Sequence, residues 1–141
     1  MKGDAGKAAE REVQTWLNKE SDNNSAFSTH RFPDARAARG ALAAQPSDNL
    51  VVHRGEITFL EVKESAEKTR LPRAKVSQYG SLLKFHWAGA RVLVIVHRSL
   101  YKDWVVLHNK HLFLDDTPAS FPFAGLPTYP TAAAALSEMY A

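Results

Sequence analysis

Hydrophobic positions recur with helical spacing in some segments of the chain and form short runs typical of strands in others. This pattern predicts the helices and strands. Helical spacing over residues 4–20 places Val13, Trp16 and Leu17 on one side of an amphipathic helix. A second helix is expected over Lys75–Trp87. Short apolar runs typical of strands occur at 27–32, 50–53, 56–63, 91–97 and 103–107. The predicted order is therefore α-β-β-β-α-β-β.

Polar and proline-rich segments separate or follow these runs. Residues 33–46 are rich in Ala and Arg and are expected to form a loop or a short helix, and residues 64–73 a charged loop. Four of the seven prolines lie within 118–130, which excludes a regular helix or a central strand there. The aromatic residues of that arm indicate that it packs on another surface. Thr131 would cap a short Ala-rich helix that ends at Met139.

Length and composition fit one domain. The chain has 141 residues, of which 45% are hydrophobic and 23% charged, as in ordinary globular proteins. We expect residues 1–110 to form the body of this domain and residues 111–141 to add an arm and a short helix to it. The absence of cysteine excludes disulfide frameworks, thiolate zinc sites and Fe–S clusters. No apolar run approaches the roughly 18 residues of a membrane span, and the charged N-terminus lacks the apolar segment of a signal peptide, so a cytoplasmic location is expected.

Charge is distributed unevenly along the chain. Residues 1–102 hold 17 basic and 11 acidic side chains, a net charge of +6, whereas residues 103–141 hold 1 basic and 4 acidic, a net charge of −3. A basic surface of this kind suits a polyanionic partner such as nucleic acid. A mildly basic enzyme with another substrate would show a similar balance.

Residues 47–63 bring three charged side chains to one point. If Arg54-Gly55 is a two-residue hairpin loop, Asp48 lies directly opposite Glu61. Lys63 points to the same face as Glu61, because side chains alternate along a strand. Like charges opposed across strands are destabilising, and the strand around Glu61 is otherwise apolar. The two carboxylates therefore need a countercharge, which Lys63 and a divalent cation would supply.

Such a cluster has a definite chemistry. Mg²⁺ is bound in proteins through one or two carboxylates, with waters and substrate phosphate as the remaining ligands. The cation polarises a phosphate and lowers the pKa of a bound water, and a neighbouring lysine can orient that water or neutralise developing charge. The alternative interpretation is an ordinary Glu-x-Lys pair on a strand edge, with Asp48 capping a turn.

At these residues the chain resembles a known superfamily. Asp48, followed after twelve residues by Glu61-Val62-Lys63, resembles the PD-(D/E)xK nuclease motif, although Pro46-Ser47-Asp48 has one serine inserted into the Pro-Asp. Residues 6–12 are similar to the Lys-Gly-x-x-x-Glu-Arg-Glu opening of archaeal-type (Hjc-like) Holliday junction resolvases, and RecU-like resolvases share these features. The resemblance covers about residues 3–108. It implies an α/β fold with a restriction-endonuclease-like αβββαβ core, in which helices flank a central mixed sheet.

The resemblance also implies roles for five residues. Asp48 and Glu61 would bind Mg²⁺, for which Mn²⁺ would substitute, and Glu10 would complete or water-bridge the metal site. Lys63 would assist the attacking water, and Gln78 would position the metal shell or the nucleophile. These are the candidate catalytic residues: Glu10, Asp48, Glu61, Lys63 and Gln78.

Two of these assignments have rivals in the sequence. Glu10 is preferred to Glu12 because it shares a helix face with Val13, whereas Glu12 lies on a different face. Phe32-Pro33-Asp34 is a literal Pro-Asp and makes Asp34 a rival of Asp48. We prefer Asp48, because no hairpin register pairs Asp34 with the Glu61 strand.

Basic side chains flank the cluster in sequence, as residues that position phosphates would. The candidates are Lys7, Arg31, Arg36, Arg39, Lys68, Arg70, Arg73 and Lys75. Our leading hypothesis is a Mg²⁺-dependent DNA endonuclease of recombination and repair that cuts branched DNA, most simply a homodimeric Holliday junction resolvase of a prokaryotic, archaeal or phage-infected cell. The alternatives are a restriction-like or repair nuclease that acts on linear duplex, flaps or ends, and a non-catalytic DNA-binding protein with the nuclease fold.

Overall fold

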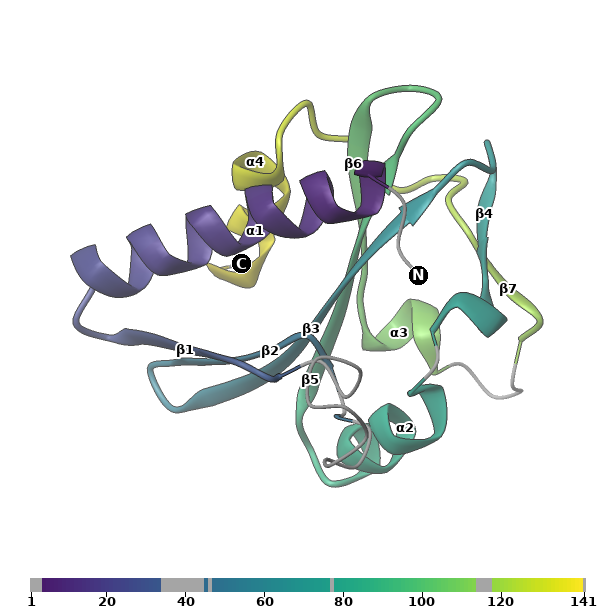
Figure 1. Cartoon of the computed structure of the whole chain (residues 1–141). Coiled ribbons are helices and arrows are strands. Elements are labelled where there is room, and N and C mark those ends of the chain that lie inside the picture. Colours follow the sequence, from purple (N-terminus) through teal and green to yellow (C-terminus); the bar gives the residue numbers. More distant parts are fainter. Residues whose placement is uncertain (1–3, 34–44, 46, 77, 114–117, 141) are drawn as a thin grey trace.

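A mixed five-stranded sheet forms the centre of the protein, in the order β1-β2-β3-β5-β6 (Figure 1). The computed structural model describes residues 4–33, 45, 47–76, 78–113 and 118–140. The sheet strands are β1 (Phe27–Arg31), β2 (Asn49–His53), β3 (Glu56–Ser65), β5 (Arg91–Arg98) and β6 (Asp103–Leu107). β3 and β5 are parallel, and the other neighbours are antiparallel. Together with helices on both faces, this topology confirms the predicted α/β class and its mixed sheet.

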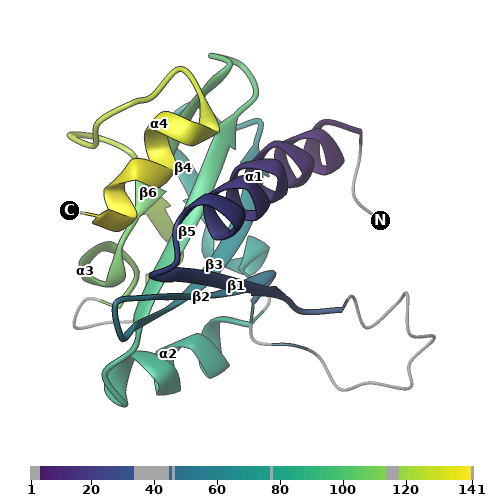
Figure 2. The same cartoon turned by 90° about the vertical axis from the view of Figure 1, so that its left-hand side faces the viewer.

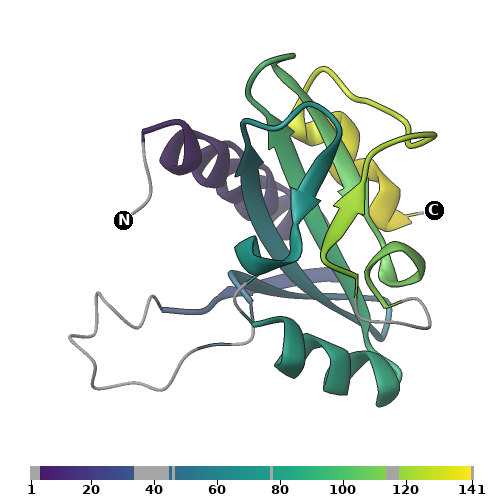
Figure 3. The ribbon, with the colours of Figure 1, turned by 90° about the vertical axis from the view of Figure 1, so that its right-hand side faces the viewer.

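Helices cover the two faces of the sheet. α1 (Asp4–Asn23) and α4 (Ala132–Leu136) lie on one face, and α2 (Tyr79–Trp87) and α3 (Asn109–Leu112) lie on the other (Figures 2 and 3). The first face buries Ala9, Val13, Leu17, Leu60, Val62, Leu93, Ile95 and Trp104 in one core. The second face buries Phe59, Leu82, Val92, Val94, Val96 and Leu112 in another. β3 and β5 are therefore covered on both sides, which explains why their sequences are apolar at successive positions.

The β2–β3 hairpin has the predicted register. Arg54 and Gly55 both have positive φ, 49° and 84°, as a type I′ loop of two residues requires. His53 consequently pairs with Glu56, and the ladder continues to the pair of Asn49 with Leu60. The ladder ends there, one position before Asp48.

Two boundaries predicted between β3 and α2 are wrong. Residues 64–73 are not a simple loop, because β3 continues to Ser65 and a further strand, β4, covers Arg70–Pro72. The second helix begins at Tyr79 and not at Lys75, since a separate 3-10 turn, η1 (Arg73–Lys75), precedes it. At the end of that turn Val76 has φ −95° and ψ 82°, which lies outside the helical region and separates the two elements.

The C-terminal arm packs on its own chain. Its strand β7 (Ser120–Pro122) pairs with β4 in a small two-stranded sheet, where the edge position tolerates proline. Further along, the backbones of Tyr129 and Trp104 exchange two hydrogen bonds of 2.8 Å. The Thr131 side chain then accepts a hydrogen bond from Ala134 N and caps α4, as predicted. Residues 137–140 form a last turn, η2 (Ser137–Tyr140).

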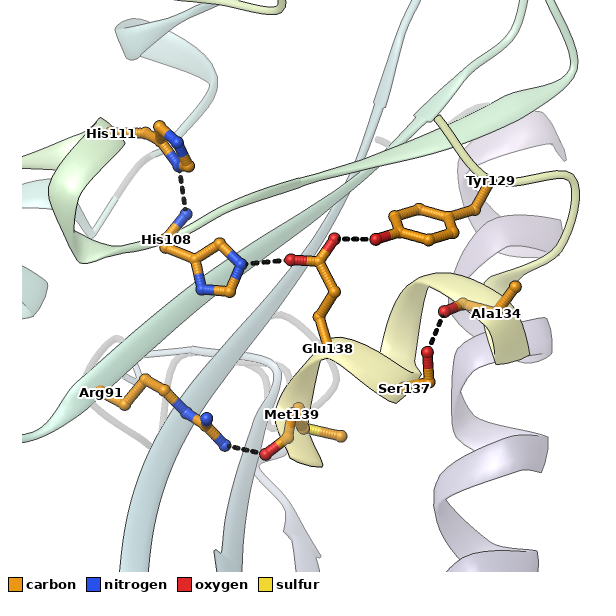
Figure 4. A network of polar contacts seen from close by, with 8 residues as sticks. All are labelled: Arg91, His108, His111, Tyr129, Ala134, Ser137, Glu138 and Met139. Carbon is orange, nitrogen blue, oxygen red and sulfur yellow. Dashed lines mark hydrogen bonds and ion pairs between the residues drawn. The ribbon is translucent and has the colours of Figure 1, made fainter. Parts of the chain in front are cut away.

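The Glu138 side chain connects this last turn to the sheet through polar contacts (Figure 4). One carboxylate oxygen lies 2.5 Å from Nε2 of His108, and the other accepts a hydrogen bond of 2.5 Å from the hydroxyl of Tyr129. Beside it, Nη2 of Arg91 donates to the carbonyl of Met139 at 2.9 Å. The end of the chain is thereby joined to the end of β6, to the arm and to the first residue of β5.

No helix within the described residues is long and apolar enough to cross a membrane.

This network predicts a loss of stability at alkaline pH. The hydrogen bond to Glu138 raises the pKa of Tyr129 to about 12, above the value of about 10 in an unfolded chain. Between these values the unfolded chain releases a proton that the folded chain retains, so the free energy of unfolding falls as pH rises through about 10 to 12. Urea unfolding followed by circular dichroism at several pH values measures this slope.

Tyr129→Phe should have a shallower slope than the parent protein over this pH range, because it removes the titrating hydroxyl. Below about pH 8 the two proteins should have parallel stability profiles, because the hydroxyl then keeps its proton in both the folded and the unfolded state. Equal slopes in the parent and Tyr129→Phe would show that Tyr129 does not contribute to the alkaline loss.

Candidate active site

Asp48 is anchored to β3 by its side chain. Its Oδ2 accepts a hydrogen bond of 2.8 Å from the backbone N–H of Val62, which extends the contact between the two strands beyond the last ladder pair. The adjacent backbone is held as well, because Phe32 N donates to the carbonyl of Asp48 at 2.9 Å. Asp48 thus lies in a bend beside Glu61, close to the predicted position, although the two do not form a regular ladder pair.

Glu61 is a buried carboxylate in an apolar strand. It is 4% exposed and neighbours Val94 of β5 in the parallel register. Alternation along β3 places it on the face of Phe59, which carries α2. Burying a carboxylate is costly unless a cation, a proton or hydrogen bonds compensate it. A carboxylate at this depth is therefore expected to be held by such a compensating group.

Lys63 lies on the same face as Glu61 and two residues further along β3, which corresponds to a rise of about 7 Å. It is half-buried and pairs in register with Val96 of β5. Beyond Asn49 no described strand pairs with β3 on this side, where the Asp48 side chain accepts from Val62 N, and we call this stretch from Glu61 onward the open edge of β3. The structure therefore brings Asp48, Glu61 and Lys63 together along β3, on the backbone spacing that the sequence predicts.

Glu10 is placed less directly. It is half-buried on α1, whose buried neighbours Ala9 and Val13 pack against Leu60 on the sheet face opposite to Glu61. It could approach the site only around the open edge of β3. Within the described ranges, no group of three or more His, Asp or Glu side chains is arranged to hold one metal ion. The role of Glu10 stays a prediction.

Glu12, its rival, has a structural contact elsewhere. Glu12 is exposed, and its Oε1 accepts a hydrogen bond of 3.1 Å from Ala132 N at the start of α4. That bond satisfies a backbone donor that has no partner within its own helix. The contact fits the sequence-based choice of Glu10 over Glu12.

The donor set fits a hard divalent cation held by two carboxylates. Both candidate ligands supply oxygen, which Mg²⁺ and Mn²⁺ prefer. The Val62 N–H donates to Oδ2 of Asp48, and Oδ1 is the other oxygen that this carboxylate could offer to a ligand. Because Mg²⁺ keeps several waters and binds through one or two carboxylates plus substrate phosphates, Asp48 and Glu61 would suffice without a third acid.

Gln78 begins α2 on the face that carries Glu61. It occupies the N-cap position with φ −104° and ψ 27°, and its carbonyl accepts a hydrogen bond of 2.9 Å from Leu82 N. The helix is held against the sheet by Phe85, whose ring stacks on Phe59 at a centroid distance of 4.2 Å. The location is compatible with the predicted role, which stays a prediction.

The predicted phosphate-binding residues differ in whether another side chain contacts them. Lys7, Lys68 and Lys75 are exposed, and Arg31 is exposed in β1, paired with Asn49 next to Asp48. Two others have partners: Arg70 forms an exposed ion pair of 3.1 Å with Glu67, and the Arg73 guanidinium lies 5.8 Å from the centre of the Tyr79 ring. Arg36, Arg39 and the rival acid Asp34 lie outside the described residues.

Asn49 is a site neighbour that sequence reasoning missed. It is buried at the start of β2, and within the described residues its Oδ1 has no hydrogen-bond partner. A buried acceptor of this kind is normally satisfied by ordered water. The signal in the sequence is a single polar residue at the beginning of an otherwise apolar strand, directly after Asp48.

The site thus combines two acids and a lysine on a mixed α/β sheet, and comparisons with known proteins give likenesses to solved structures but none to sequences. No protein-family model matches the chain, and no curated protein matches its sequence. Among solved structures, the fold is similar to that of Hjc, a Holliday junction resolvase from the archaeal hyperthermophile Archaeoglobus fulgidus. The TM-score is 0.49 and the identity 18%, over 80% of this chain and 85% of that chain. This likeness concerns the fold alone.

Proposed function

We propose that the protein is a Mg²⁺-dependent DNA endonuclease that hydrolyses phosphodiester bonds at branched DNA, as a Holliday junction resolvase does. The observation that carries the proposal is the placement of Asp48 beside buried Glu61, with Lys63 on the same strand face, at the open edge of β3. A phosphodiesterase requires such a cluster.

Each residue has a defined part in the proposed reaction. Asp48 and Glu61 would hold Mg²⁺, which when bound polarises the scissile phosphate and lowers the pKa of a coordinated water. Lys63 would orient the attacking water and neutralise charge as it develops on the phosphate. Arg31 and Lys68 lie on exposed chain near the site and would position neighbouring phosphates without reading sequence.

Two symmetric cuts in one junction require two active sites. We therefore also propose that the active form is a homodimer. Sedimentation equilibrium of the chain with and without a four-way junction measures this directly. A protein that remains a monomer on the junction would favour single cuts in linear DNA.

A cleavage assay tests the proposed function. Purified protein should cut a labelled four-way junction in Mg²⁺, and should bind but not cut it in Ca²⁺. Asp48→Asn should abolish cleavage because it removes a metal-binding charge, while DNA binding survives. Asp22→Asn is the matched control, since it neutralises an exposed acid near the end of α1 and should remain active.

The same assay separates the alternatives. Equal cleavage of junction and linear duplex would favour a restriction-like or repair nuclease. DNA binding without cleavage in Mg²⁺ or Mn²⁺ would favour a non-catalytic DNA-binding protein with this fold. Full activity in Asp48→Asn would remove this site from consideration.

A further inference from the structure

The turn between β5 and β6 exposes large apolar side chains. Leu100 is 58% exposed and Tyr101 52%, and the following Lys102 is exposed as well. Lys102 has φ 54°, in the left-handed region that residues with a Cβ rarely adopt. Such conformations persist where the surrounding structure enforces them, often at functional positions.

The residues that enforce this turn are its neighbours on β5 and β6. Two guanidinium nitrogens of Arg98 donate to the two carboxylate oxygens of Asp103, each at 2.7 Å. The carbonyl of Arg98 accepts hydrogen bonds from Tyr101 N at 3.1 Å and Lys102 N at 2.8 Å. The guanidinium of Arg98 also lies 4.4 Å from the centre of the Tyr101 ring. The ring is thus held against a fixed cation and remains half-exposed.

The turn lies beside the candidate active-site strand. Ser99 donates to the carbonyl of Ser65 through its backbone N–H at 3.1 Å and its hydroxyl at 3.2 Å. Ser65 is two residues beyond Lys63, about 7 Å along β3. Figures 1 and 3 show the β5–β6 turn next to the connection from β3 to β4. Arg98 reaches this connection, since its Nη1 lies 3.5 Å from the carbonyl of Lys68.

The surroundings of the turn carry positive charge. Among the described residues, neither Lys68 nor Lys102 forms an ion pair, whereas Arg98 is neutralised by Asp103. Exposed lysines beside an exposed aromatic ring are the combination that proteins use to hold single-stranded or distorted nucleic acid. The lysines contact phosphates, and the ring stacks on a base.

We propose that the turn Ser99–Lys102 contacts nucleic acid, with Tyr101 and Leu100 packing on the face of an unpaired or unstacked base and Lys102 on a phosphate. The proposal rests on the proposed function and deepens it. In linear duplex both faces of each base are covered by stacking, so only branch points and single strands offer this contact. The turn lies beside β3, about four residues along that strand from Glu61. It would therefore help to select branched DNA at the candidate active site.

The test uses the full chain with Asp48→Asn, so that binding is measured without cleavage. Fluorescence anisotropy compares a four-way junction, a single strand and a linear duplex of the same sequence. Adding Tyr101→Ala should weaken binding to the junction and the single strand roughly tenfold, the usual effect of losing one base–aromatic stack, and should leave the duplex nearly unchanged. Tyr101→Phe, which keeps the ring, should bind all three DNAs like the parent.

A control and a second readout make the result specific. Trp87→Ala removes an aromatic side chain that is 76% exposed at the end of α2, at the opposite end of the molecule (Figure 1), and should not change the preference among the three DNAs. A 2-aminopurine base at the branch point should change fluorescence on binding of the parent and respond much less to Tyr101→Ala. Thermal unfolding of the variants should match the parent, because both side chains are exposed.

Three outcomes would overturn the inference: parent-like binding by Tyr101→Ala, an equal loss on all three DNAs, or no measurable binding of DNA by the parent. The first two leave the proposed nuclease function intact if Mg²⁺-dependent cleavage is observed. Conversely, selective loss of junction and single-strand binding without any cleavage would retain this contact and reject the nuclease.

Discussion

Glu61→Gln is expected to lower the rate of phosphodiester cleavage by about a hundredfold or more while the protein stays folded and binds DNA. The amide has nearly the shape of the carboxylate, so the buried position of Glu61 beside Val94 of β5 is preserved. What is lost is the negative charge that would hold Mg²⁺. Single-turnover cleavage of a labelled junction across a range of Mg²⁺ concentrations measures both the maximal rate and the metal requirement.

Stability provides a second readout for this variant. Thermal unfolding shows whether Glu61→Gln keeps a cooperative fold, since the amide preserves the volume of the carboxylate. Lower activity with undiminished stability is the result that a purely structural role of Glu61 would not give.

Glu64→Gln is the matched control for Glu61→Gln. Glu64 is half-buried on the same strand, but alternation places it on the opposite face of β3, toward α1. It should therefore retain cleavage. An equal loss in both variants would indicate a general effect on the strand, and full activity in Glu61→Gln would exclude Glu61 as a metal ligand.

The core of the candidate site could be predicted from the sequence because its determinants are local. The loop Arg54-Gly55 fixes the hairpin register, and alternation along β3 then fixes the face of Glu61 and Lys63. The end of the ladder could not be predicted, because it depends on how the backbone enters β2. There the side chain of Asp48, and not its backbone, bonds β3.

Contacts between distant parts of the chain were the ones that sequence patterns missed. β4 contains a single buried residue, Leu71, whose partner Phe121 lies in β7. Neither segment shows a strand pattern by itself, because three residues are too few to establish a period. Similarly, the helical pattern placed Glu10 on the buried side of α1 but could not tell which face of the sheet that helix covers.

The pairing of β4 with β7 leads to the second large effect, on stability. Phe121→Ala should lower the free energy of unfolding by about 3–5 kcal/mol, the usual cost of replacing a buried aromatic side chain by alanine. Phe121 is 0% exposed, pairs with Leu71 and lies 6.0 Å from the Tyr79 ring, so it joins the arm to β4 and to α2 at once. Its loss would leave a cavity that three separate elements enclose.

Urea unfolding followed by circular dichroism measures this cost, with Phe85→Ala as the control. Phe85 is also aromatic and packs on Phe59, but it is 37% exposed, so its replacement should cost clearly less. A cost below about 1 kcal/mol would show that Phe121 is not part of a closed core.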